Sequence, residues 1–347
     1  MRSSTDIPLS IKVVATAGAK TLTPCVLELG GKCPCLWDEI APLDLSVGAS
    51  RIVWAKTLNC GQNCVSPDYL LVHKSQVDAL VPELIQQLEI QFGKDPKQSS
   101  LGKLVAPGHV QRAIELMEEM ESLAQNDPKI QILCGGSKEC DVKAGYVAPT
   151  FVLNPPLNSR MMQEEIFSPI LPIIVVESRD EACDIINSRP GIPLGLYTYT
   201  SSDAVFKEMI ERCRAGTAVH NDCLIQFSGP HMPFGGLGSS GLGAYRGAKS
   251  FEVFSHMLPT IYRPTFRGSD VNMLRCHPYP AWKQFMLNHL VPRLPDIPAM
   301  KNFKRAFVFG VIAVGVAKFV PGADNIIHAG RVAVAGVLQK AAAFINP

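Results

Sequence analysis

The sequence has no excess of charge of one sign. Its 33 Lys and Arg residues nearly balance its 31 Asp and Glu residues, which leaves a formal net charge of +2, and only 18% of the residues are charged. It contains no long run of Lys or Arg. Proteins that bind nucleic acids usually carry a basic patch or stripe, so the composition argues against a nucleic-acid partner.

A secretion signal and a disulfide framework are also missing. The first ten residues, MRSSTDIPLS, contain no apolar stretch of the length found in signal peptides, so we expect an intracellular protein. Its eleven cysteines are then reduced thiols that pack as small apolar side chains. Their number is odd, and a chain of this length does not depend on disulfides for stability.

The cysteines form no complete metal-binding pattern. Cys60 and Cys64 are spaced loosely like one half of a zinc site. The second half is missing, because Cys33 and Cys35 are too close together for the usual chelating loop. A disulfide between Cys60 and Cys64 would close a very small, strained ring. We therefore expect no metal site and no disulfide here.

Helices and strands alternate along most of the chain. Apolar runs predict strands at 68–74, 130–136, 170–178, 194–200 and 217–222, and helical spacing predicts helices at 44–56, 75–93, 109–125, 179–188 and 203–216. Ser75 and Gly93 are the expected cap and stop of the second helix. The run at 170–178 is apolar on both faces, as in a covered parallel sheet. This alternation predicts an α/β fold with a largely parallel sheet flanked by helices.

The composition of the chain changes towards its C-terminus. A glycine-rich stretch at 228–247 predicts an ordered loop where backbones approach closely. Residues 306–317 are then uninterruptedly apolar. As a helix they would span about 18 Å, whereas the hydrocarbon core of a bilayer is about 30 Å thick. Basic residues precede them, which suits an interfacial or partly inserted anchor; a buried terminal helix explains the run equally well.

Cys64 follows a tripeptide, Gly61-Gln62-Asn63, that can turn the chain sharply. A cysteine placed after such a turn can expose its sulfur and point its own backbone N–H at a developing oxyanion. Thiol catalysis also needs a base, and Glu28 lies in the apolar run CVLELGG. If Glu28 faces a cleft, burial raises the pKa of its carboxyl. An edge-strand glutamate facing water is the simpler alternative.

Four motifs occur in the order and approximate spacing of the aldehyde dehydrogenase superfamily. They are LELGGKCPC, NCGQNCVSPDY, QEEIFSPILPI and PFGGLGSSGLGAYRGAKSFEVFSH. The form of the second motif and the ending of the fourth resemble the class 3 and fatty aldehyde dehydrogenase branch. The likeness extends from about Ala19 to His256, and four independent motifs in order make it specific.

The resemblance implies a covalent mechanism. Cys64 matches the family's nucleophile, and Cys60 matches a neighbouring non-catalytic cysteine. Glu28 matches the general base that activates water. In this mechanism the thiolate attacks an aldehyde, a hydride leaves the thiohemiacetal for the nicotinamide, and water then hydrolyses the remaining thioester to a carboxylic acid.

The resemblance also implies a cofactor, NAD or NADP. Glu165 and Phe167 match the pair that holds its ribose and nicotinamide. Asn221 and Phe234 lie in segments that help to shape the family's active-site region. Two positions depart from the family: Cys33 replaces the usual Ser, and Ser168 replaces the usual Gly.

The family's segment before LELGGK builds most of its dinucleotide-binding domain, and the 347 residues contain no counterpart of it. The expected domains are a remnant of a Rossmann-type dinucleotide-binding domain at 1–31, a catalytic domain at 32–262, a strap or linker at 263–300 and an apolar helical tail at 301–347. Three explanations stay open: an incomplete gene model, a truncated paralogue, or a missing half supplied by another chain.

The predicted activity is the NAD(P)-dependent oxidation of medium- to long-chain aldehydes, which loss of the cofactor domain would reduce or abolish. Two alternatives stay open: a non-catalytic interaction or dimerisation module, and a cofactor-independent esterase. The expected partners are a small aldehyde, a second copy in a homodimer, and a membrane contacted through the tail. The expected location is the cytoplasm or the cytoplasmic face of a membrane such as the endoplasmic reticulum.

Overall fold

The computed structural model describes residues 9–262, 276–285 and 287–288. The chain divides into two units, Met1–Met257 and Leu258–Pro347. In the second unit the described residues include the short helix α9 (Ala281–Phe285). The predicted tail at 301–347 lies outside the described residues. Across the residues that are described, no helix is both long enough and apolar enough to cross a membrane.

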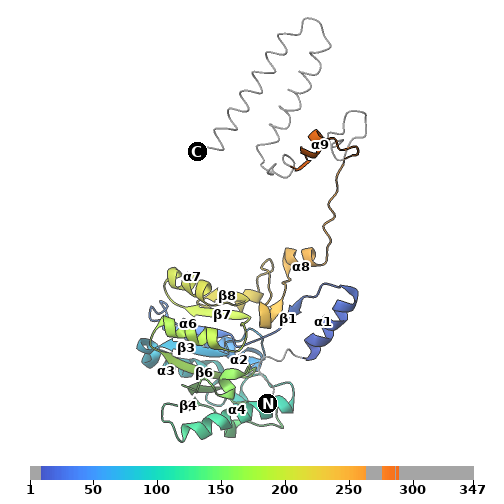
Figure 1. Ribbon diagram of the computed structural model, residues 1–347. Coiled ribbons are helices and arrows are strands. Elements are labelled where there is room, and N and C mark those ends of the chain that lie inside the picture. The colour runs from blue at the N-terminus through green and yellow to red at the C-terminus, as the bar shows by residue number, and fades with distance from the viewer. Residues whose placement is uncertain (1–8, 263–275, 286, 289–347) are drawn as a thin grey trace, which may run out of the picture. The chain divides into compact units, whose positions relative to one another are not determined.

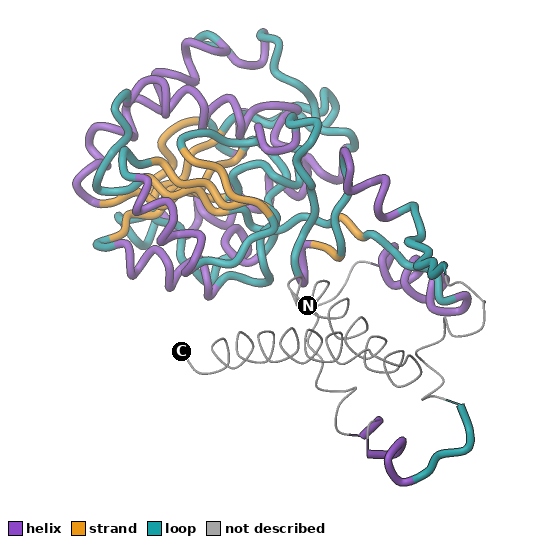
Figure 2. The backbone as a smooth tube through the Cα atoms, turned by 90° about the horizontal axis from the view of Figure 1, so that it is seen from above, coloured by secondary structure: helices purple, strands orange, loops and turns teal. Residues whose placement is uncertain are grey.

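A seven-stranded sheet lies at the centre of the first unit (Figures 1 and 2). Its order is β4-β5-β6-β3-β2-β7-β8, and only β4 runs antiparallel to its neighbour. The strands are β2 (Pro34–Trp37), β3 (Tyr69–His73), β4 (Gln131–Cys134), β5 (Thr150–Leu153), β6 (Ile170–Val176), β7 (Gly195–Tyr199) and β8 (Thr217–His220). The predicted largely parallel sheet is thereby confirmed.

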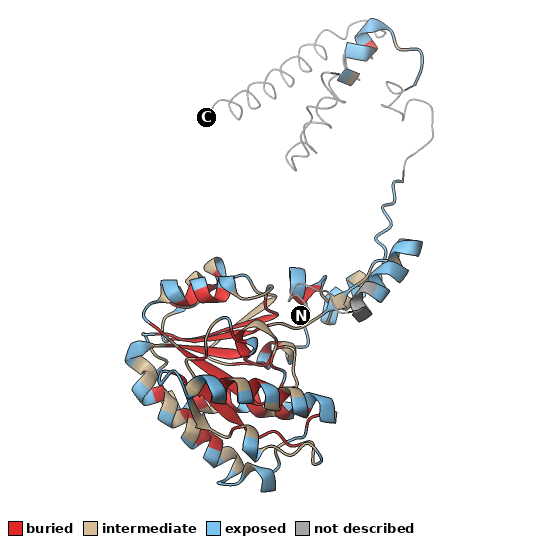
Figure 3. Ribbon diagram, turned by 60° about the horizontal axis from the view of Figure 1, so that its bottom comes forward, coloured by how far each residue is buried: buried red, intermediate tan, exposed pale blue. Residues whose placement is uncertain are grey.

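Helices cover both faces of this sheet, as the alternation predicted. The helices that line the strands are α2 (Leu45–Thr57), α3 (Val77–Phe92), α4 (Pro107–Ala124), α6 (Arg179–Ser188) and α7 (Asp203–Arg212). Apolar residues of α2 and α3 share one buried cluster with the strands, and those of α6 and α7 share another. Figure 3 shows the strands and the inward sides of the helices buried, with the outer sides exposed.

Side-chain caps explain where several helices begin. The Asp44 carboxylate accepts a hydrogen bond from the Val47 N–H at 2.9 Å at the start of α2. Ser178 and Ser202 cap α6 and α7 in the same way. The predicted cap at Ser75 is wrong, because a short 3-10 turn precedes α3 and Gln76 is its first flanking residue. Gly93 ends α3 with φ +73°, as predicted.

Three short strands matter for the site, and of these only the strand around Glu28 was predicted. Strand β1 has only two residues (Leu27–Glu28) and pairs antiparallel with β9 (Gly241–Leu242). Strand β2, a four-residue central strand, follows directly. The remaining helices are α1 (Leu9–Thr21), α5 (Arg160–Gln163) and α8 (Gly247–Val253). The pairing of β1 with β9 joins the first and fourth sequence motifs.

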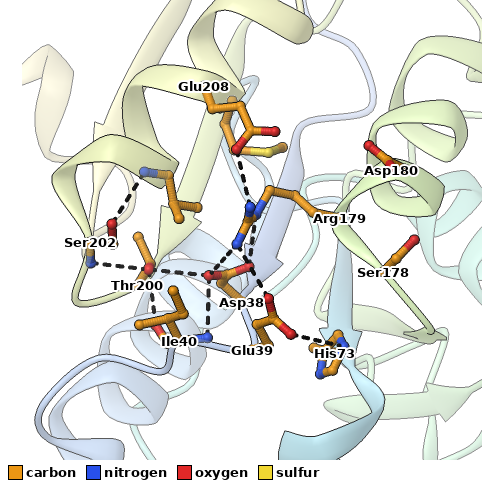
Figure 4. Close-up of polar contacts among 12 residues, drawn as sticks. Asp38, Glu39, Ile40, His73, Ser178, Arg179, Asp180, Thr200, Ser202 and Glu208 are labelled. Atoms are coloured by element: carbon orange, nitrogen blue, oxygen red, sulfur yellow. Dashed lines mark hydrogen bonds and ion pairs between the residues drawn. The ribbon is translucent and has the colours of Figure 1, made fainter.

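The parallel strands give the sheet two distinct edges. The segments that lead into β2, β3 and β6 carry the first three motifs, so these motifs meet at the edge formed by the amino ends of the strands. We call this the amino edge. The opposite, carboxyl edge carries a polar network around Asp38 and Arg179 (Figure 4).

Candidate active site

The turn before Cys64 has an unusual backbone. Asn59, Cys60 and Gly61 all have positive φ, at 53°, 56° and 72°. Asparagine and glycine tolerate this region better than other residues, whereas Cys60 does not. Local hydrogen bonds hold the turn: the Asn59 amide donates to Gln62 O at 3.1 Å, and the Gln62 amide donates back to Asn59 O at 2.9 Å. Side chains of the turn itself therefore stabilise this uncommon backbone conformation.

Gln62 also ties the turn to a distant segment. Its side-chain amide donates to Lys103 O at 3.1 Å, and its Oε1 accepts from the Val105 N–H at 3.0 Å. Cys60 points into a buried cluster and has no exposed surface. Burial raises the pKa of its thiol to about 12. Cys60 is thus an inert core thiol.

Cys64 is half-buried and lies on a well-supported backbone. The Cys33 thiol donates to Cys64 O at 3.4 Å. The Tyr197 hydroxyl donates to the next carbonyl, that of Val65. The first bond comes from Cys33, directly before β2, and the second comes from β7, so the turn that carries Cys64 rests on the core of the sheet.

The Cys64 sulfur lies 3.9 Å from Glu28 Oε1. Glu28 is exposed and lies in the two-residue strand β1. The interpretation of Glu28 as a carboxylate tuned by burial is therefore wrong, and the simpler alternative of an exposed strand glutamate describes it. Its place beside the sulfur comes from the pairing of β1 with β9 and not from an apolar pocket.

The environment of Cys64 favours the neutral thiol. Burial, followed by the nearby charges of Glu28 and Glu165, raises its pKa to about 11. The backbone N–H groups of Cys64 and Val65 act in the opposite direction. The thiol is protonated in this arrangement at neutral pH, so catalysis requires the proton to leave when substrate is present.

Glu165 has the features of a ligand-binding carboxylate. It is largely buried, yet its Oε1 has no hydrogen-bond partner. A Cβ at Gly30 would lie 2.4 Å from that oxygen, so only glycine leaves the carboxylate its place. Burial and the charge of Asp68 raise its pKa to about 7, against the opposing effects of the Gly31 N–H and of Lys32. An unpaired buried acceptor suits a hydroxyl-bearing ligand.

Phe167 stands two residues after Glu165 and is 41% exposed. Its φ is +52°, an uncommon conformation for a bulky residue. The ring and the carboxylate therefore offer an apolar surface and an acceptor from one short segment. They fit the sugar and the ring of a dinucleotide.

One buried ion pair ties three motifs together, and sequence reasoning missed it. Lys32 pairs with Asp68 and also donates to Met161 O at 2.8 Å and Glu164 O at 2.9 Å. The second Asp68 oxygen accepts from the Ile166 N–H at 2.9 Å. The only sequence signal was a lysine directly after Gly-Gly and an aspartate directly before a strand.

The structure places Phe234 and Asn221 at opposite edges of the sheet. Phe234 is 2% exposed and pairs through its backbone with Tyr245, whose hydroxyl donates to Glu28. Asn221 follows β8 at the carboxyl edge, where its amide exchanges two 2.8 Å bonds with the Thr200 backbone. The structure brings Phe234 to the neighbourhood of Glu28 and places Asn221 at the other edge of the sheet.

The cysteines and acidic side chains form neither a disulfide nor a metal-binding group in the described part of the chain. All eleven cysteines are free thiols. No group of three or more His, Cys, Asp or Glu residues suited to a metal ion occurs among residues 9–262, 276–285 and 287–288.

Comparisons with known proteins agree on one family. A model described as "Aldehyde dehydrogenase family" matches residues 8–258. The dimeric NADP-preferring aldehyde dehydrogenase of Mus musculus is 41% identical over 78% of this chain and 56% of its own length. Aldehyde dehydrogenase family 3 member A2 of Rattus norvegicus is 38% identical over 80% of this chain and 55% of its own.

A solved structure, the substrate-bound state of Staphylococcus aureus AldH, superposes with a TM-score of 0.72. It is 34% identical and covers 82% of this chain and 58% of its own. The chain thus spans little more than half the length of the curated relatives it matches.

Proposed function

This chain belongs to the aldehyde dehydrogenase family, and from that premise we propose that its site converts aldehydes to carboxylic acids through a covalent bond to Cys64. The observation that carries the proposal is the 3.9 Å approach of the Cys64 sulfur to Glu28 Oε1. The turn that presents Cys64 buries the other candidate, Cys60. A nucleophile and a base are thereby within reach of one another.

The residues act in sequence. The Cys64 thiol gives its proton to solvent and its sulfur bonds to the aldehyde carbon, while the backbone N–H groups beside the sulfur stabilise the oxyanion. NAD or NADP, held by Glu165 and Phe167, would supply the acceptor for the hydride that leaves that carbon. Glu28 then takes a proton from water as the water attacks the thioester, and the carbon–sulfur bond breaks to release a carboxylic acid.

Glu165 and Phe167 are the residues that would hold the cofactor. The unpaired Glu165 oxygen supplies an acceptor for ribose hydroxyls, and the exposed Phe167 ring supplies a surface beside the nicotinamide. The name of the mouse relative supports NADP as the candidate to test first. Purified protein titrated with NADP and with NAD, and followed by calorimetry, tests this: no heat with either removes the cofactor from the proposal.

We further propose lipid-derived, medium- to long-chain aldehydes as substrates. The support is the resemblance of the second and fourth motifs to the fatty aldehyde branch, together with the apolar run at 306–317, which would bring the enzyme to a membrane surface. The location would then be the cytoplasmic face of a membrane. Co-sedimentation with phospholipid vesicles checks this, and loss of binding on deleting 301–347 is the expected result.

A homodimer is the proposed assembly. The mouse relative is named as dimeric, and α2 presents exposed apolar residues, Val47 and Trp54, next to a hollow lined by Arg51, Phe92 and Ile225. A second copy would bury this surface. Light scattering of the wild type and of Trp54→Asp tests the surface, and a dimer that persists unchanged in the variant would exclude it.

Ester hydrolysis is a second candidate, favoured by the same contact because neither Cys64 nor Glu28 needs a cofactor to transfer an acyl group. Ester turnover also allows a direct test of the roles of Cys64 and Glu28. Turnover of p-nitrophenyl acetate is measured for the wild type and for Cys64→Ser, Cys60→Ser and Glu28→Gln. Cys64→Ser should lose essentially all turnover, and Glu28→Gln should accumulate acyl-enzyme because deacylation slows by about 10²-fold or more.

Cys60→Ser is the matched control, because it removes a sulfur four residues away without touching Glu28. We expect it to retain turnover per folded molecule. Equal turnover of wild type and Cys64→Ser would refute the assignment of the nucleophile.

A further inference from the structure

A third side chain completes the contacts around Glu28. The Tyr245 hydroxyl donates a hydrogen bond to Glu28 Oε2, while Glu28 Oε1 lies 3.9 Å from the Cys64 sulfur. The two oxygens of one carboxylate therefore contact two different partners. This arrangement fixes the orientation of an otherwise exposed side chain.

Tyr245 is itself held rigidly. Its N–H and C=O both pair with the backbone of Phe234 at 2.9 Å, and its ring meets the Phe234 ring edge-on with centroids 6.3 Å apart. The next residue, Arg246, has φ +85° and lies over the Phe234 ring at 5.4 Å. The Tyr245 hydroxyl is thus fixed in place by its own loop.

The same loop also fixes the backbone of Glu28. Glu28 lies opposite Gly241 in the β1–β9 pair, and the Leu29 N–H donates to Ser240 O at 3.0 Å. A Cβ at Gly241 would lie 2.5 Å from Leu27 O, so the two strands approach as only glycine permits. One loop therefore holds both the main chain and the carboxylate of the base.

Building on the proposed function, we propose that Tyr245 is a positioning residue that holds Glu28 against the Cys64 thiol, so that the nucleophile rests protonated until the carboxylate is released. A carboxylate beside a sulfur disfavours the thiolate. The raised pKa of Cys64, caused first by burial and then by Glu28, agrees with this. Release of Glu28 would ionise the sulfur more easily and free the carboxylate for water.

The test is the rate at which iodoacetamide alkylates Cys64 at pH 8, read by mass spectrometry of each cysteine peptide. The proteins are the wild type, Tyr245→Phe, Glu28→Gln and the double variant. Below the pKa of a thiol, one unit of pKa changes its thiolate fraction tenfold. We therefore expect about tenfold faster alkylation in either single variant, and no further increase in the double variant, because Tyr245 acts only through Glu28.

Internal controls distinguish a positioning role of Tyr245 from a general loosening of the turn before Cys64. The exposed Cys276 gives a reference rate, the buried Cys60 reports opening of the turn, and Tyr262→Phe removes a hydroxyl from a tyrosine that is 95% exposed. Tyr262→Phe should behave as the wild type. Faster alkylation of Cys60 together with Cys64 in Tyr245→Phe would mean a loosened turn and would overturn the proposal.

The remaining outcomes distinguish the role of Tyr245 from the pairing of Glu28 with Cys64. A wild-type rate in Tyr245→Phe with a faster rate in Glu28→Gln overturns the role of Tyr245 and leaves the proposed function intact. An unchanged rate in Glu28→Gln overturns the pairing of Glu28 with Cys64 itself, on which the proposed function depends. Rate increases that multiply in the double variant show that Tyr245 acts independently of Glu28, which also overturns the proposal.

Discussion

At the carboxyl edge of the sheet, the buried Asp38 carboxylate has a full set of partners. Arg179 donates to both of its oxygens at 3.2 and 3.3 Å, and the Thr200 hydroxyl and the Ile40 N–H donate at 3.3 Å. Arg179 in turn binds Glu208 at 3.1 Å (Figure 4). At the amino edge, the Glu165 carboxylate is also largely buried, but its Oε1 has no partner.

Uncommon backbone angles occur at both edges. Cys60 and Phe167 have positive φ at the amino edge, and so does Leu224 after β8 at the carboxyl edge, although none of the three is Gly, Asn or Asp. Unpaired buried polar atoms and uncommon backbone angles each cost free energy, and they persist only where the rest of the fold supports them. At the amino edge these features fall on the segments of the candidate site, whereas the Asp38 carboxylate at the carboxyl edge is fully paired.

This division reverses a general rule for open α/β sheets, in which ligands bind beyond the carboxyl ends of the strands. Here the four sequence motifs meet at the amino ends, and the carboxyl ends of β2 and β7 are closed by the Asp38–Arg179 network. Strand topology alone would place a ligand at the carboxyl edge. The candidate site is instead proposed at the amino edge, from the chemistry of the segments that lead into β2, β3 and β6.

The largest effect is expected from Gly61→Ala at the amino edge. A Cβ there would lie 2.4 Å from the carbonyl oxygen of Ser168, which is backbone and cannot move easily, and φ is +72°. We expect a loss of about 3 kcal/mol or more in the free energy of unfolding, together with loss of ester turnover. Urea denaturation and the p-nitrophenyl acetate assay measure the two effects.

Gly93→Ala separates the cost of an alanine at positive φ from the cost of the steric clash with Ser168. Gly93 has nearly the same φ, +73°, but no atom lies within 4 Å of its added Cβ. It should cost only about 1 kcal/mol and leave turnover unchanged. If the two alanine variants were equally stable, the contact of Gly61 with Ser168 would have no energetic weight.

Arg179→Met tests the carboxyl edge. Removing the guanidinium leaves Asp38, whose side chain is 3% exposed, with a buried charge and only neutral donors. Because Arg179 is itself 21% exposed, water can replace part of the loss, and we expect a cost of roughly 2 to 3 kcal/mol. Alkylation of Cys64 by iodoacetamide should not change, because the nucleophile lies at the other edge.

Arg160→Met is its matched control. Arg160 makes ion pairs with Glu115 and Glu164 but is 47% exposed, so its removal should cost less than about 1 kcal/mol. A larger loss in Arg160→Met than in Arg179→Met would remove the distinction between the edges on which the comparison rests.

The sequence predicted the elements with strong periodicity. The expected strands at 170–178 and 194–200 match β6 and β7 closely, and the helix at 179–188 has the bounds of α6. Strand β2, with the sequence PCLW, escaped prediction because it is short and begins with proline, which is rare inside a central strand. Its place between β3 and β7 depends on tertiary packing.

The contacts of the candidate site were less accessible to sequence reasoning. Cys64 and Glu28 are 36 residues apart, and Tyr245 is 217 residues from Glu28, so no local spacing joins them. Resemblance to a family paired Cys64 with Glu28, whereas the Tyr245 and Lys32 contacts required the folded chain. For Glu28 the sequence left both burial and an exposed strand position open, and the two-residue strand β1 exposes it.

The smallest and most specific effect is the pH dependence of stability at Glu165. Its pKa is about 7 in the folded state, against about 4.3 for an unfolded glutamate. The folded state therefore binds more protons between these values, and stability falls as the pH rises from about 4.3 to 7. Glu165→Gln has no such loss. As the pH rises from 5 to 8, the free energy of unfolding of this variant should therefore increase by about 2 kcal/mol relative to that of the wild type.

The adjacent Glu164 is the matched control and should respond with the opposite sign. Although burial opposes them, hydrogen bonds from Arg112 and Arg160 hold its pKa below the ordinary value. Its charged form stabilises the fold, and that contribution is lost as the pH falls. Glu164→Gln should therefore lose stability relative to the wild type at pH 8 and approach it in acid. Urea denaturation at pH 5, 6.5 and 8 measures both variants, and parallel curves for Glu165→Gln and wild type would show that Glu165 carries no unsatisfied charge at this edge.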